Sequence, residues 1–115
     1  MPTYRFKAGD TFAPAGVVAL PVGIDWQGRA KVCDADGIEI SECVVDVAPV
    51  DDEGQFLVSV VVDAATTNTW PRPSAPGASL ALYCDYELFD PDGDTVISSE
   101  TMRILVEFDP TVNNA

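Results

Sequence analysis

The sequence predicts an all-β domain, a sandwich of about seven antiparallel strands with one short helical turn. Turn residues recur at short, regular intervals, and the stretches between them are rich in Val, Ile, Tyr and Phe. Several of these stretches alternate apolar and polar side chains, the period of two that half-buried strands show. Nine prolines and eight glycines are spread along the chain, which leaves little room for long helices.

The first third of the chain contains three expected strands. Residues 4–7 alternate aromatic and basic side chains, which predicts an opening strand. Prolines and glycines interrupt residues 11–24, so we expect an edge strand there. Alternation returns over residues 26–32, where Trp26 and Val32 share one face that we expect to be core.

Residues 38–47 form a strand only if its alternation is broken once. Continuing the parity of Ile38 and Ile40 would bury Glu42 and Asp46, and unpaired buried carboxylates cost too much free energy. A one-residue β-bulge near Ser41-Glu42 removes this conflict. The bulge keeps both isoleucines inside and adds to the core face Cys43, Val45 and Val47.

The bulged strand and residues 54–62 are expected to form a hairpin across the acidic turn Asp51-Asp52-Glu53. Phe56, Val58 and Val60 share its inner face. Its outer face then carries Val44, Leu57 and Val61, which is more apolar than a solvated face needs. We therefore expect these three residues to form a partner interface.

The remaining elements are a helical turn and two strands. Asp63 suits a helix N-cap and Pro71 a helix end, which predicts a turn over residues 64–69 that places Trp70 over an open end of the sandwich. Alternation then predicts strands over residues 80–88 and 102–108, from which we expect Leu82, Tyr86 and Ile104 in the core. The pattern as a whole is immunoglobulin-like. We expect one domain over residues 1–110 and a C-terminal tail over residues 111–115 that orders only against a partner.

The charge of the chain excludes several partners. Nineteen acidic and six basic residues give a net charge of -13, which disfavours nucleic acid and anionic membranes. Neither a membrane-spanning run nor a signal-peptide core is present, so we expect a chain that is made and kept in a cytoplasm unless it is carried out in an assembly. Four of the basic residues precede residue 32. This asymmetry leaves two readings open, a solvated acidic surface or a basic end that meets the acidic body of a neighbouring copy.

No catalytic or metal site is predicted. The chain has no histidine, and its three cysteines, Cys33, Cys43 and Cys84, form no metal-binding spacing. We expect free thiols, no bound metal and no cofactor. The acidic segments 34–37, 51–53 and 90–94 have the composition of turns rather than of a calcium loop or a glycosidase pair. The sequence therefore indicates that the protein is not an enzyme.

The two tryptophans leave one alternative of another class. Trp26 and Trp70 are expected in the core, because aromatic side chains of small sandwiches usually lie there. The alternative is a carbohydrate-binding module whose ligand rim contains Trp70 and Arg72.

A series of motifs resembles a known family. In order, they are Gly9-Asp10-Thr11-Phe12, Asp34-Ala35-Asp36-Gly37, Gly54-Gln55-Phe56, the segment from Asp63 to Trp70-Pro71, Asp85-Tyr86, Asp90-Pro91-Asp92-Gly93-Asp94 and Asp109-Pro110-Thr111. With these motifs the chain resembles the small immunoglobulin-like tail and baseplate structural proteins of tailed bacteriophages, similar to the N-terminal domain of upper baseplate proteins. It departs from the family over residues 13–24 and in a longer loop at residues 71–79.

The resemblance implies a non-enzymatic virion protein of a phage or prophage. Its expected role is protein–protein attachment in the tail or baseplate region, as an adaptor for fibres or baseplate. It implies other virion proteins as partners and a homo-oligomer within the particle. A capsid decoration or head–tail connecting protein is the alternative within the same structural class.

Overall fold

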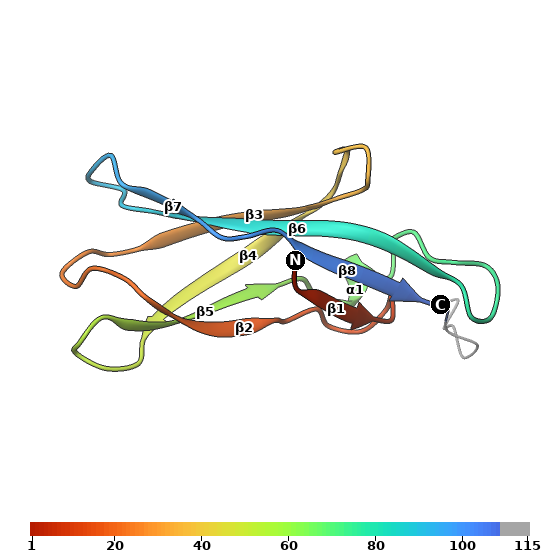
Figure 1. Ribbon diagram of the computed structural model, residues 1–115, viewed down its shortest axis with the longest axis horizontal. Helices are drawn as coiled ribbons and strands as arrows, with labels where there is room; N and C mark the ends of the chain where they lie inside the picture. The colour runs from red at the N-terminus through yellow and green to blue at the C-terminus, as the bar shows by residue number, and fades with distance from the viewer. Residues whose placement is uncertain (109–115) are drawn as a thin grey trace.

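The computed structural model describes residues 1–108, and within them the chain forms eight β-strands and one helical turn (Figure 1). In chain order the elements are β1 (Thr3–Phe6), β2 (Ala15–Ala19), β3 (Gln27–Cys33), β4 (Glu39–Pro49), β5 (Gln55–Val61), α1 (Ala64–Thr67), β6 (Ser79–Phe89), β7 (Val96–Ser98) and β8 (Met102–Glu107). The all-β prediction is confirmed. The expected tail, residues 111–115, lies outside the described residues.

The strands form one curled, mixed sheet in the order β1-β8-β6-β3-β4-β5-β2, with β7 paired to β6. The expectation of a purely antiparallel arrangement is wrong at one place, because β1 and β8 are parallel. Strand β4 joins the two halves of the sheet. Residues 39–43 of β4 pair with β3, and residues 44–49 pair with β5. Since β4 changes partner along its length, the sheet turns on itself instead of dividing into two separate sheets.

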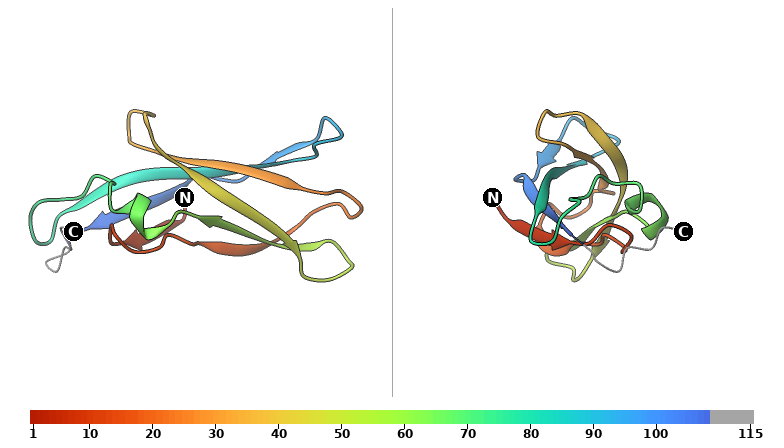
Figure 2. Two further views of the ribbon diagram at one scale, coloured as in Figure 1. Left: turned by 180° about the vertical axis from the view of Figure 1, so that it is seen from behind. Right: turned by 90° about the vertical axis from the view of Figure 1, so that its right-hand side faces the viewer.

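The molecule is elongated. Its extents are 49 × 27 × 24 Å, and the long strand β6 runs along most of the longest one, whereas β4 crosses it obliquely (Figure 2). Viewed end-on, the strands surround a central core (Figure 2, right). No helix within residues 1–108 is long and apolar enough to cross a membrane.

Two clusters of buried side chains fill the curl. One contains Trp26, Phe56, Val58 and Leu88, and the other is built around Val32, Leu82, Ile104 and an aromatic group. The predicted core residues Trp26, Val32, Phe56, Val58, Leu82 and Ile104 are buried. Tyr86, also predicted there, is only partly buried and packs against both clusters. Strands β5 and β6 supply both clusters, so they hold the two halves of the sheet together.

The predicted helical turn is present as α1. The Asp63 carboxylate accepts a hydrogen bond from the Thr66 backbone N–H at 2.8 Å, which is an N-cap contact. After the turn, Trp70 enters the core and packs against Phe6 and Phe12, with ring centroids 5.4 and 5.5 Å away. The turn therefore directs an aromatic side chain into the core.

The predicted bulge is also present. Val32 pairs with Ser41 and Cys33 with Glu39, so Ile40 is the extra residue of β4. Ile40 and the residues after the bulge that point inward, Cys43 and Val45, pack against the core. The expectation for Ile38 is wrong, because this residue precedes the strand in the 34–38 turn and is 62% exposed.

Candidate interaction surface

The outer face of β4, β5 and β2 contains the three residues predicted to form an interface. Val44 lies opposite Val61, and Leu57 lies opposite both Ala48 of β4 and Val17 of β2. The alternate residues of β5, Phe56, Val58 and Val60, are buried beneath this face. Because side chains alternate along a strand, the buried set places Leu57 and Val61 outside.

These side chains differ in how much solvent they meet. Val44 is 63% exposed, Val17 56% and Leu57 40%. Val61 is only partly exposed. Val17 was not among the predicted interface residues, because the interrupted pattern of residues 11–24 did not fix the register of β2. The structure adds it to the face directly beside Leu57.

The apolar face consists of two rows rather than one patch. Val44 and Val61 form the first row, and Ala48, Leu57 and Val17 form the second. Between them lies a row of Asp46, Ser59 and Ala15, which separates Leu57 from Val44 and Val61. Rows on one face of a sheet repeat about every 6.6 Å along the strands. A protein that bound this face would have to supply two separate apolar contacts and a polar group for Asp46.

The neighbouring outer face, over β3 and β6, is charged. Arg29 donates to Glu87 at 2.8 Å, and its guanidinium lies 4.9 Å from the centre of the Phe89 ring. Lys31 lies between Glu42 and Asp85 in the strand register. The charged residues of this face line a shallow groove of about 400 Å³, namely Arg29, Lys31, Glu42, Asp85 and Glu87. The groove contains both charge signs, so it has no single preference for an anion or a cation.

Two of the four basic residues that precede residue 32 are paired within the chain. Arg5 lies 3.7 Å from Glu107, and Arg29 is bonded to Glu87 as described above. All four side chains are more than a third exposed, so each ion pair contributes little to stability. These contacts weaken the reading in which a basic end meets the acidic body of a neighbour, because acidic residues of the same chain already face those arginines.

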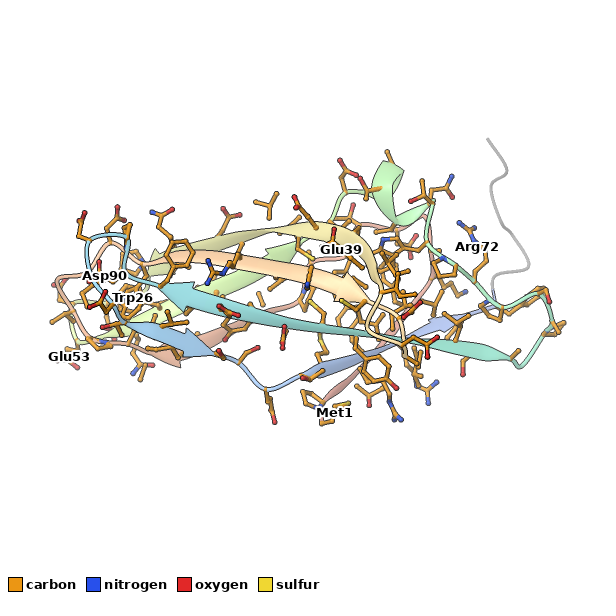
Figure 3. The ribbon with its side chains drawn as sticks, turned by 90° about the horizontal axis from the view of Figure 1, so that it is seen from above. Met1, Trp26, Glu39, Glu53, Arg72 and Asp90 are labelled. Atoms are coloured by element: carbon orange, nitrogen blue, oxygen red, sulfur yellow. The ribbon has the colours of Figure 1, made fainter. Side chains whose placement is uncertain are left out.

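The proposed ligand rim of the carbohydrate-binding alternative does not exist. Trp70 is 2% exposed, and its indole N–H donates to the Ser41 hydroxyl at 3.0 Å. A ring in this position cannot stack on a sugar. Arg72 donates to the backbone carbonyl of Asn68 and so closes the end of α1. Trp26 is 5% exposed and lies at the opposite end of the molecule from Arg72 (Figure 3).

The acidic segments are turns, as predicted. Asp34 accepts hydrogen bonds from the N–H groups of Asp36 and Ile38, and Asp51 accepts them from Glu53 and Gln55. Asp90 accepts one from the Asp92 N–H at 3.0 Å. The first carboxylate of each segment therefore stabilises its own loop. Within residues 1–108, no group of three or more acidic or cysteine side chains is arranged to hold a metal ion.

The three cysteines are free thiols in the structure. Cys84 is buried, and contact with Cys43 together with burial raises the pKa of the Cys84 thiol. A raised thiol pKa suppresses the reactive thiolate. This environment is that of a core side chain rather than of a nucleophile.

Two polar residues that sequence reasoning missed hold the region around Trp70. Thr67 is fully buried, donates to the Asp10 carbonyl at 2.6 Å and accepts from the Gly9 N–H at 3.1 Å. Ser41 accepts the Trp70 indole N–H. Both residues are small and polar, and nothing in a period-two pattern marks such residues as buried.

No protein-family model and no curated protein sequence matches this chain.

Proposed function

We propose that this chain is a non-enzymatic structural protein of a bacteriophage or prophage virion. In this role it attaches to other virion proteins in the tail or baseplate region. The observation that carries the attachment role is the apolar outer face of β4, β5 and β2, where Val44 and Leu57 meet solvent. The place in a virion is supported by the family resemblance of the motifs that run from Gly9 to Asp94.

The energetics favour a face that is covered in an assembly. Each apolar side chain contributes about 1.5–3 kcal/mol when it is fully buried. Ordering of side chains and loss of free rotation and translation offset part of this gain. Two apolar rows with one polar row between them therefore suit a contact that is made within a particle and reinforced by other contacts there.

The attachment role is tested by Val44→Asp and Leu57→Asp in the strain that produces the particles. Both residues are exposed, so we expect both variants to fold, with unchanged thermal unfolding, but to be depleted at least about tenfold from purified particles. Val96→Asp is the matched control, because Val96 is 52% exposed on β7, away from this face. Normal incorporation of both interface variants would place the attachment surface elsewhere.

The place in the particle is tested separately, by counting copies and by electron microscopy of labelled particles. A tail or baseplate protein is present in a small, fixed number of copies near the tail. A capsid decoration protein is present in proportion to the capsomers, and that result would replace the tail assignment. Absence of the chain from all particles would overturn the virion role itself.

A further inference from the structure

Strand β2 has one side without a partner. It is the last strand in the sheet order, and no strand within residues 1–108 pairs with its outer side (Figure 1). On its inner side, the Val62 N–H donates to the Phe12 carbonyl at 2.8 Å, the Val60 N–H to the Pro14 carbonyl at 3.0 Å, and the Leu20 N–H to the Gly54 carbonyl at 2.8 Å. Within residues 12–20, the even-numbered residues therefore direct their backbone N–H and C=O groups toward β5. By alternation, Ala15, Val17 and Ala19 direct theirs outward.

The features that usually protect an edge strand are missing here. Edge strands are commonly guarded by charged residues, by proline or by a bulge. Residues 11–24 contain no charged side chain, the longest such stretch in the sequence. Pro14 and Pro21 lie outside β2, and its register with β5 is unbroken. This edge is therefore open to pairing with another strand.

We propose that β2 pairs with β2 of a second copy of this chain, antiparallel and centred on Val17. In this register Val17 meets Val17 of the second copy, and Ala15 meets its Ala19. These are the residues whose backbone groups point outward, so every facing pair can exchange both of its hydrogen bonds. The row of Ala48, Leu57 and Val17 then continues into the same row of the second copy.

A cavity beside the same edge also fits the second copy. A groove of about 300 Å³ opens at Ala15 and Gly16 and is lined mainly by apolar side chains, among them Val58, Val60 and Met102, with Asp85 and Glu100 also in its lining. Gly16 presents no side chain, and nothing lies within 4 Å of the position that a Cβ atom would take. The proposed register places Val18 of the second copy opposite Gly16. Its side chain would cover the part of the groove that Gly16 leaves open.

The charge of the chain favours this edge over other surfaces for self-association. Two copies of a chain with net charge -13 repel each other. Repulsion is reduced along β2 itself, because it lies in the middle of the uncharged stretch; Asp85 and Glu100 line the groove beside it and are the carboxylates that the second copy would approach. Pairing through β2 uses the edge of the sheet, whereas the proposed attachment to other virion proteins uses its outer face. The dimer proposal therefore does not depend on the role in a virion.

The test is sedimentation of the purified chain from micromolar to millimolar concentration at physiological salt. We expect a monomer–dimer equilibrium and, by amide hydrogen exchange, concentration-dependent protection of Ala15, Val17 and Ala19. Val17→Pro removes an outward N–H that the β5 ladder does not use, which edge strands tolerate. We expect this variant to be folded and at least tenfold weaker in dimerisation.

A second variant covers the case in which Val17→Pro does not fold. Val17→Lys changes an exposed residue and places two lysines at the dimer axis, so dimerisation should weaken at least tenfold. The same change lowers the net negative charge, so association through any other surface would be unchanged or stronger. Val44→Asp should dimerise normally, because β5 separates β4 from β2. A parent chain that is monomeric at millimolar concentration would overturn the proposal, as would dimerisation of Val17→Lys at parental strength.

Discussion

Gly28 in β3 shows how one residue allows the sheet to curl. A Cβ atom at this position would lie 2.9 Å from Val45 Cβ and 3.2 Å from Leu88 Cδ2, and it would meet a Val45 methyl group closer still. Val45 is on β4 and Leu88 on β6, the two neighbours of β3. Their side chains meet above Gly28 because this position is empty. A larger residue would have to displace the side chains of Val45 and Leu88.

Gly28→Ala should therefore lower the free energy of unfolding by about 1–3 kcal/mol, as inserted core methyl groups usually do. Urea unfolding followed by fluorescence of the buried tryptophans measures the change. Gly16→Ala is the matched control, because it also lies in a strand but has open space where its Cβ would be. Equal stability of the two variants would mean that Val45 moves aside without cost.

Among the elements, the strands could be predicted where the alternation of apolar and polar residues assigns their side chains to one face of the sheet. The bulge followed from the conflict between Ile40 and Glu42, because burying a carboxylate has a large and general cost. Ile38 was misplaced, since parity says nothing about where a strand begins. The parallel pairing of β1 with β8 and the division of β4 between two neighbours were also missed. A period of two assigns side chains to faces but does not select partners.

Alternation also predicted which residues form the candidate surface, but it did not predict how these residues are spaced across the strands. Parity placed Val44, Leu57 and Val61 on one outer face, and the structure confirms that face. The spacing that inserts Asp46 and Ser59 between them depends on the cross-strand register, which the turn determines. Burial of Trp70 was predicted, but its contact with Ser41 joins residues far apart in sequence, so no local pattern could indicate the hydrogen bond of its indole N–H.

Helix α1 is held at its start by a carboxylate, which makes its stability depend on pH. Hydrogen bonds from Thr66 lower the pKa of Asp63 below its ordinary value. A lowered pKa in the folded state means that Asp63 stabilises the fold above the pKa of the unfolded chain. This contribution is lost as the pH falls through the lower, folded-state pKa. The loss therefore occurs below the ordinary aspartate value of about 3.9.

Asp63→Asn separates this effect from the titration of the other carboxylates, because asparagine also caps helices but does not ionise. We expect the stability difference between parent and variant to shrink as the pH is lowered through the acidic range. Asp63→Ala should be less stable than Asp63→Asn at neutral pH. Unfolding in urea at a series of pH values provides the measurement, and a difference that does not change with pH would show that Asp63 does not titrate differently in the folded state.

At the scale of the whole molecule, repulsion among the acidic residues opposes folding. The chain carries a net charge of -13 on a body of 49 × 27 × 24 Å. At 0.01 M ionic strength the screening length is about 30 Å, so charges across the whole width of this body repel one another. At 0.15 M it is about 8 Å, and only near neighbours still interact. The favourable ion pairs, Arg5–Glu107 and Arg29–Glu87, are exposed and contribute little.

Adding sodium chloride between about 0.01 and 0.15 M should therefore stabilise the fold, because it screens long-range repulsion more than the two short contacts. The denaturation midpoint in urea, which is uncharged, is expected to rise over this range. A variant with Asp52→Asn, Asp92→Asn and Asp94→Asn removes three charges from exposed turns and should depend less on salt. A midpoint that falls with salt would mean that attractive pairs outweigh the repulsion.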